Sequence, residues 1–136
     1  MRTILVVRNN PACEAILRHE FKEETTTGKT KLIFIYPEEL FDVWTTRGEE
    51  CFCVKSPYRK IRIFVITPNC ASHILSQPIL TALRLQFKKR IVIAIILDKG
   101  PTTIPTDNHH KPDLACFVGD LKTKLDEQFG WVGLHD

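Results

Sequence analysis

Acidic residues are missing from the middle of this chain. Residues 51–97 contain no Asp or Glu but eight Lys or Arg, whereas nine acids lie in residues 1–50 and seven in residues 98–136. Hydrolysis and group transfer commonly use a carboxylate as acid, base or nucleophile. The middle segment therefore either belongs to a site that has lost its acid or forms a surface that never performed chemistry. If its basic groups share one face, the molecule is bipolar, which favours head-to-tail self-association or an acidic partner. The alternative is that they cap solvated helix ends.

Long apolar runs are also absent. No stretch approaches the roughly 20 apolar residues of a membrane-spanning helix, and the apolar start TILVV (residues 3–7) is too short for a signal peptide. The five cysteines form an odd, irregular set, so we expect free thiols in a reducing cytoplasm. With 136 residues, 43% of them hydrophobic, the chain is expected to fold as one globular domain, residues 1–136.

The motifs of several enzyme and cofactor sites are incomplete. No GxGxxG follows an apolar run, and TTTGKT has Glu23 where a phosphate-binding loop needs glycine. The expected strands lack the terminal acids that would hold magnesium in a phosphoacceptor domain. Cysteine and histidine spacings do not match structural zinc sites, although a set could be assembled on paper from Cys51, Cys53, His109, His110 and Cys116. We therefore expect no catalytic residues, no metal and no cofactor.

Apolar runs alternating with helical patterns predict the fold class. The expected strands are residues 3–7, 31–36, 61–67, 90–97 and 114–118, and the expected helices are residues 11–24, 76–87 and 120–129. Asn10 and Pro11 suit a helix start, and Ala15, Ile16 and Phe21 suit its apolar stripe. Residues 38–60 are ambiguous: EELFDVW suggests a short helix, and CFCVK an edge strand or an extended connection. The pattern predicts an α/β fold, a flavodoxin-like five-stranded parallel sheet of order 2-1-3-4-5 with helices on both faces. A proline-rich segment, residues 98–112, stands where the fourth crossover helix would be.

Residues 61–105, IRIFVITPNCASHILSQPILTALRLQFKKRIVIAIILDKGPTTIP, resemble part of the Toll/interleukin-1 receptor (TIR) domain family. In that family a strand ending in Ser/Thr-Pro/Glu-Asn precedes a helix, a second apolar strand and an Ile-Pro loop. The resemblance implies a TIR-like fold over the whole chain. The family's first box and its Arg-Asp…Pro-Gly loop are not matched. Members that cleave NAD carry a Glu in the helix, whereas this chain has Pro78, or Ile79 in a shifted alignment. A weaker similarity links SQPILTALRLQF (residues 76–87) to the TIR-like segment of B-cell phosphoinositide 3-kinase adaptors.

The leading hypothesis is a non-catalytic, cytoplasmic TIR-like adaptor, scaffold or decoy in innate-immune signalling, which binds TIR-domain proteins or itself. The resemblance puts the main contact surface in the loop after the second strand, here Tyr36, Pro37, Glu38, Glu39 and Asp42. A basic surface on a neighbouring copy could receive it, formed by Lys60, Arg62, Arg84, Lys88, Lys89 and Arg90.

Two other hypotheses remain open. One is an NAD-cleaving TIR enzyme whose acid has moved to Glu38 or Glu39. The other is a basic surface that binds an acidic partner, an anionic membrane or nucleic acid. The basic cluster at residues 88–90 is short and has no aromatic stacking platform beside it, so nucleic acid is not the expected partner.

Overall fold

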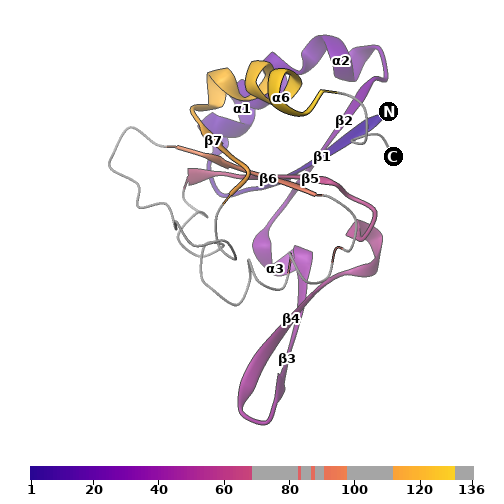
Figure 1. Cartoon of the computed structure of the whole chain (residues 1–136), viewed down its shortest axis with the longest axis vertical. Helices are drawn as coiled ribbons and strands as arrows, with labels where there is room; N and C mark the ends of the chain where they lie inside the picture. Colours follow the sequence, from indigo (N-terminus) through magenta and orange to yellow (C-terminus); the bar gives the residue numbers. More distant parts are fainter. Residues whose placement is uncertain (69–82, 84–86, 88–90, 98–111, 131–136) are drawn as a thin grey trace.

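The computed structural model describes residues 1–68, 83, 87, 91–97 and 112–130. Within them, seven strands and several short helices follow one another along the chain (Figure 1). Their order is β1 (Arg2–Val7), α1 (Pro11–Glu20), α2 (Lys22–Thr26), β2 (Thr30–Ile35), α3 (Pro37–Leu40), β3 (Phe41–Thr46), β4 (Glu49–Val54), η1 (Ser56–Tyr58), β5 (Ile63–Ile66), β6 (Val92–Ile96), β7 (Leu114–Cys116), η2 (Val118–Asp120) and α6 (Leu121–Phe129).

The main sheet is parallel and has the order β2-β1-β5-β6-β7. This arrangement confirms the predicted flavodoxin-like α/β fold and its 2-1-3-4-5 strand order. Apart from Arg2 and Thr3 of β1, the three central strands are apolar on both faces, and all of their residues are buried, which is why they read in the sequence as hydrophobic runs. None of the described helices is long and apolar enough to cross a bilayer.

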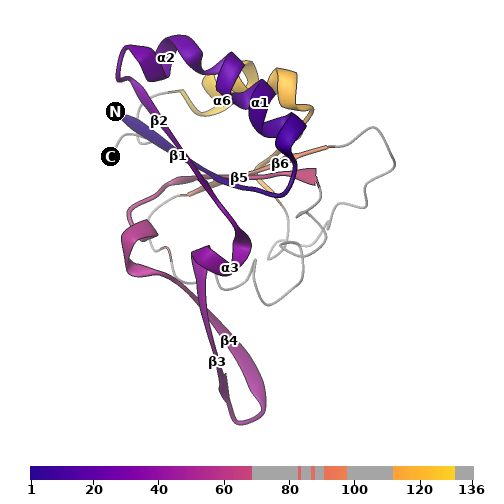
Figure 2. The ribbon, with the colours of Figure 1, turned by 180° about the vertical axis from the view of Figure 1, so that it is seen from behind.

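Each face of the sheet has its own apolar core. Ile4 and Val6 point to the face covered by α1 and α6, whereas Leu5 and Val7 point to the opposite face. Figures 1 and 2 show α1, α2 and α6 together on one side of the sheet and α3 on the other. The α3 side also receives Leu83 and Phe87 from the expected helix of residues 76–87. The Phe87 ring packs edge-on against Phe64, with ring centroids 5.4 Å apart. The rest of that expected helix lies outside the described residues.

The first predicted helix is shorter than expected and rotated about its axis. Asn10 caps it as predicted, because its side-chain oxygen accepts a hydrogen bond from the Cys13 N–H at 3.0 Å. The helix ends at Glu20, and a separate short helix begins at Lys22, so the expected single helix over residues 11–24 was wrong. Cys13, Leu17 and Phe21 form the buried stripe at i, i+4 spacing, while Ala15 and Ile16 are exposed. The predicted stripe was correct only at Phe21.

A buried cation joins β1 to two helices. Arg2 is 0% exposed; its guanidinium lies 2.9 Å from the Glu24 carboxylate of α2 and 2.7 Å from the Asp126 carboxylate of α6. Thr30 donates a hydrogen bond to Glu24 at 2.9 Å, and the Lys122 ammonium lies 3.4 Å from the same carboxylate. This network holds α2 and α6 against the amino-terminal edge of the sheet.

The connection between β2 and β5 is a short helix followed by a β-hairpin. β3 and β4 pair only with each other among the described strands, and they project away from the main sheet (Figures 1 and 2). Arg47 and Gly48 form the turn with φ values of 55° and 79°, as a type I′ turn requires. The short helix expected over EELFDVW, residues 38–44, is present only as far as Leu40. Residues 41–44 are strand instead, because Phe41 is already extended, with φ −113° and ψ 140°. CFCVK is a strand, one of the two predicted alternatives. We call β3 and β4 together the arm.

Candidate interaction surface

The predicted interaction loop, residues 36–42, is one helical turn followed by the start of β3. Pro37 occupies the first turn of α3, and the Glu39 carboxylate accepts a hydrogen bond from the Tyr36 N–H at 3.4 Å. Leu40 and Phe41 are buried in the core beneath the sheet, which fixes the turn to the body. Glu38 and Glu39 consequently face solvent. The sequence located the exposed acids correctly; the short helix expected there is present at Glu38 and Glu39 but not at Asp42, which lies in β3.

Tyr36 links this turn to the carboxyl end of β1. It is 41% exposed, and the Arg8 guanidinium lies 4.9 Å from the centre of its ring. Arg8 also forms an ion pair with Glu14 of α1, its Nε lying 3.0 Å from the carboxylate. The first turn of α3 is therefore anchored to the carboxyl-terminal edge of the sheet.

The arm continues the acidic turn into solvent. Residues 42–46 are all exposed, and they include two large apolar side chains, Val43 at 54% and Trp44 at 50% exposure. Val43 lies opposite Phe52, and Trp44 lies opposite Cys51, on the two faces of the hairpin. Among the described residues, no Lys or Arg forms an ion pair with Glu38, Glu39 or Asp42. The acids and the two apolar residues thus follow one another along the chain and all face solvent, with Val43 and Trp44 on opposite faces of the arm.

Basic residues gather at the base of the arm. Lys55 follows β4, and Arg59 holds the chain by donating from its Nε to the Val54 carbonyl at 3.1 Å. Of the predicted basic surface, Lys60 is exposed and Arg62 is half-buried. The remaining predicted members, Arg84, Lys88, Lys89 and Arg90, lie outside the described residues. Two of the predicted cations therefore lie in the described chain, Lys60 directly after Arg59 and Arg62 directly before β5.

A cavity of about 560 Å³ opens at the carboxyl-terminal edge of the sheet, where doubly wound proteins commonly bind ligands. Its walls are mainly apolar and are formed by Asn10, Ala12, Cys13, Ile16, Pro68, Ile96, Leu97, Phe117 and Val118. Asn10 is already engaged as a helix cap. Burial, and secondarily the neighbouring Glu14, raises the pKa of Cys13 to about 11, so this thiol is protonated at neutral pH. A protonated thiol is a poor nucleophile and a poor metal ligand.

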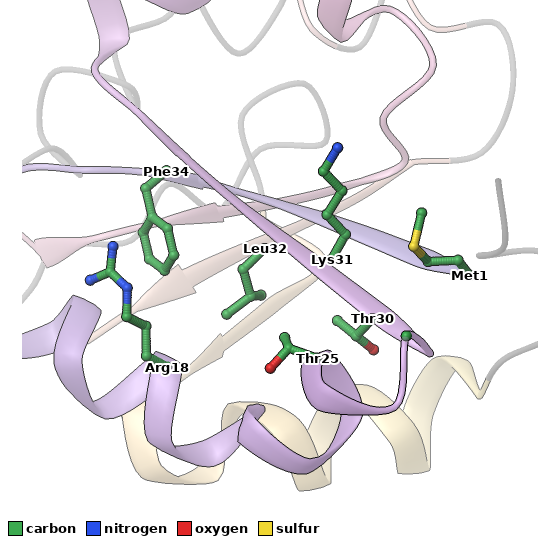
Figure 3. A pocket seen from close by; sticks show the side chains of 8 residues that line it. Met1, Arg18, Thr25, Thr30, Lys31, Leu32 and Phe34 are labelled. Atoms are coloured by element: carbon green, nitrogen blue, oxygen red, sulfur yellow. The ribbon is translucent and has the colours of Figure 1, made fainter.

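A second cavity, of about 510 Å³, lies along the edge strand β2 (Figure 3). Two cations, Arg18 and Lys31, line it. The other lining residues are Met1, Thr25, Gly28, Thr30, Leu32 and Phe34. Arg18 stacks on Phe34, with its guanidinium carbon 4.0 Å from the ring centre. Figure 3 shows Arg18 and Lys31 on opposite sides of the β2 ribbon, so the two charges do not converge on one anion.

The cysteines do not assemble with other ligands within the described part of the chain. Cys51 and Cys53 lie two residues apart in β4 and face the same side of the arm, as their spacing in a strand requires. Burial raises the pKa of Cys116 above its ordinary value. No group of three His, Cys, Asp or Glu among the described residues could hold a metal ion. Cys70, His109 and His110 lie outside them.

The arm is the feature that sequence reasoning missed. Its signal is Arg47-Gly48 between two short runs, FDVWTT and EECFCV, that are rich in β-branched and aromatic residues. A two-residue connection containing glycine between such runs favours a hairpin over a helix.

Comparison with known proteins identifies no family for this chain. No protein-family model matches the chain, and no match was found among curated proteins or solved structures. The TIR resemblance of residues 61–105 therefore stays a prediction from sequence.

Proposed function

We propose that this protein is a non-catalytic, TIR-like interaction domain of cytosolic signalling, an adaptor, scaffold or decoy that associates with TIR-domain proteins or with itself. The observation that carries the proposal is the exposed acidic turn of α3, which continues into the projecting arm. Glu38, Glu39 and Asp42 face solvent there, beside exposed Val43 and Trp44. Acidic groups around apolar anchors are the anatomy of many protein interfaces.

The charge distribution supports a partner with a basic surface. This chain supplies one itself, at Lys55, Arg59 and Lys60, which are partly or fully exposed. Complementary charges of this kind raise the association rate and select orientation, whereas the apolar contacts supply most of the affinity. Added salt is therefore expected to slow association, because the charges lie in solvent where counterions screen them.

The test is charge reversal at the acidic turn. Glu38→Lys with Glu39→Lys should lower the self-association constant about tenfold, since each lost surface pair is worth about 0.2–1 kcal/mol and reversal adds repulsion. Sedimentation velocity over a range of protein concentrations measures the constant. The matched control is Glu23→Lys with Glu127→Lys, which reverses two exposed acids on the opposite, α2–α6 side of the sheet.

Unchanged self-association of the turn variant would remove this surface from the proposal. A heterotypic form is tested by titrating the protein against a purified receptor TIR domain. In that experiment, equal binding by both double variants would count against the acidic turn.

The alternative, an NAD-cleaving enzyme with a relocated acid, is separated by a nicotinamide-release assay. Glu38 and Glu39 line neither of the two cavities described above. We expect no release from NAD at high protein concentration. Release that disappears with Glu38→Ala or Glu39→Ala would overturn the non-catalytic proposal.

A further inference from the structure

The outer edge of β3 is an open strand edge. β3 and β4 form a two-stranded sheet, so within the described part of the chain each has a partner on one side only. Five consecutive residues of β3, residues 42–46, are exposed, whereas residues 51–53 of β4 are half-buried. Exposed edges that carry apolar residues pair readily with another strand. β3 is the more accessible of the two edges.

Charges at the two ends of the arm have opposite signs on the β3 side. The tip carries Arg47, while the base carries Glu38 and Glu39 on α3. On the β4 side the signs are reversed, with Glu49 near the tip and Lys55 and Arg59 at the base. An antiparallel neighbour brings the tip of one arm to the base of the other. On the β3 side this brings Arg47 of one copy to the acidic α3 turn of the other, and residues 38–62 are neutral as a whole, with five acids and five bases.

We propose that β3 pairs antiparallel with β3 of a second copy, which joins two arms into a four-stranded sheet about a two-fold axis. This inference rests on the proposed function and specifies its homotypic form. Directly opposite residues share one face of a sheet, and the two-fold axis preserves each face. The pairing register must therefore set odd residues opposite odd residues and even opposite even.

The charges select one register among these. With the axis at Val43, each Val43 faces its copy and Asp42 faces Trp44. Arg47, which follows the last residue of β3, then lies beyond Phe41 of the copy, beside the α3 turn that carries Glu38 and Glu39. With the axis at Trp44, Arg47 lies level with the apolar Phe41 instead. The register centred on Val43 therefore combines an apolar centre with ion pairs at its rim, the usual arrangement of binding energy in an interface.

The contact is a strand-edge interface formed by β3, residues 41–46, together with the charges that flank it. Because one two-fold axis relates the copies, the contact closes on itself and yields dimers instead of filaments.

Disulfide trapping tests the register directly. In a Cys51→Ser, Cys53→Ser background, Val43→Cys sets two thiols on Cα atoms about 4.5–5.5 Å apart, within the range that a disulfide spans. An added oxidant, oxidised glutathione, accepts the two electrons and releases two reduced glutathione molecules as the bond forms. We expect a covalent dimer on a non-reducing gel. Thr45→Cys is the control, because its two copies would be offset by about 13 Å along the strands.

Trapping at Thr45→Cys as efficient as at Val43→Cys would overturn the inference, and so would trapping at Trp44→Cys in place of Val43→Cys. The Cys51→Ser, Cys53→Ser protein without a new cysteine must stay monomeric on the gel. A covalent dimer of that protein would show that another cysteine forms the bond.

A second measurement uses Trp44, the residue next to Val43 on the opposite face of the arm. Trp44→Ala should weaken self-association about tenfold or more, as aromatic hot-spot residues do, and unchanged association would contradict the pairing. These experiments distinguish a wrong arm pairing from a wrong proposed function. If reversal at Glu38 and Glu39 abolishes association while trapping shows no preference for Val43, the acidic turn binds but the arm pairing is wrong.

Discussion

Replacing Arg2 tests the account of how the sheet is held to its helices. Arg2→Met removes the charge but keeps a long apolar side chain, so the packing above Phe21 is largely retained. Glu24 and Asp126 would then lose a fully buried partner that lies 2.9 Å and 2.7 Å away. Removing one member of a buried ion pair costs about 3–5 kcal/mol, because the other charge is left uncompensated.

The structure places the expected cost near the lower end of that range. Lys122 stays 3.4 Å from Glu24 and 3.6 Å from Asp126, and the Asp126 side chain is 31% exposed, so water compensates part of the loss. We expect about 3 kcal/mol, a large share of the roughly 5–15 kcal/mol that stabilises a typical domain.

Urea unfolding, followed by circular dichroism, measures the loss. With a slope of about 2 kcal/mol per molar urea, a cost of 3 kcal/mol lowers the midpoint by about 1.5 M. Lys22→Met, at an exposed position of α2, is the control and should change stability by less than about 0.5 kcal/mol. Adding Glu24→Gln to Arg2→Met should cost less than the sum of the single changes, because the two side chains interact. An Arg2→Met midpoint within about 0.3 M of wild type would refute the reasoning.

The remaining predictions concern a thiol, a helix cap and the arm. The pKa of Cys13 is raised from 9.0 to about 11, so the folded state holds this proton more tightly than the unfolded state does. The contribution of this proton to the free energy of unfolding is therefore fully present below pH 9 and is lost as the pH rises toward 11. Cys13→Ala should flatten that part of the stability curve, measured by urea unfolding at each pH. Asn10→Ala should cost about 1 kcal/mol in the same assay, since the Cys13 N–H loses its acceptor, and Asn10→Asp should recover most of it. Arg47→Glu should weaken self-association in sedimentation velocity, and adding Glu39→Arg should restore it by exchanging the paired charges; no recovery would contradict the proposed register.

The main sheet could be predicted from sequence because its strands are covered on both faces. Residues 4–7 and 63–66 are continuous apolar runs, and such runs separated by crossovers leave few strand orders open. The start of the helix at Pro11 was predicted correctly, because the cap at Asn10 and the proline in the first turn depend only on neighbouring residues. Its buried face was wrong because the periodicity allowed Ile16 as well as Leu17, and only the sheet decides which of them is covered.

Contacts between distant parts of the chain were beyond sequence reasoning. The ion pair of Arg2 with Asp126 joins residues 124 positions apart, and nothing local distinguishes Arg2 from a solvated cation before a strand. The arm was missed for another reason. FDVW fits one helical turn as well as a strand, and the choice depends on its pairing with residues 49–54. Of the candidate site, the acids of residues 38–42 were placed on the surface correctly, because short acidic runs rarely lie in a core.

The central claim is that the acidic turn and the arm form a protein-binding surface with a second copy as partner. Sedimentation velocity of the wild-type protein beside Trp44→Ala, over the same range of concentrations, tests it most directly. The account predicts that the wild type forms a reversible dimer. It also predicts that the self-association constant of the variant is lower by about tenfold or more, with both proteins equally folded. Wild-type protein that stays monomeric throughout, or a variant that associates as strongly as the wild type, would contradict it.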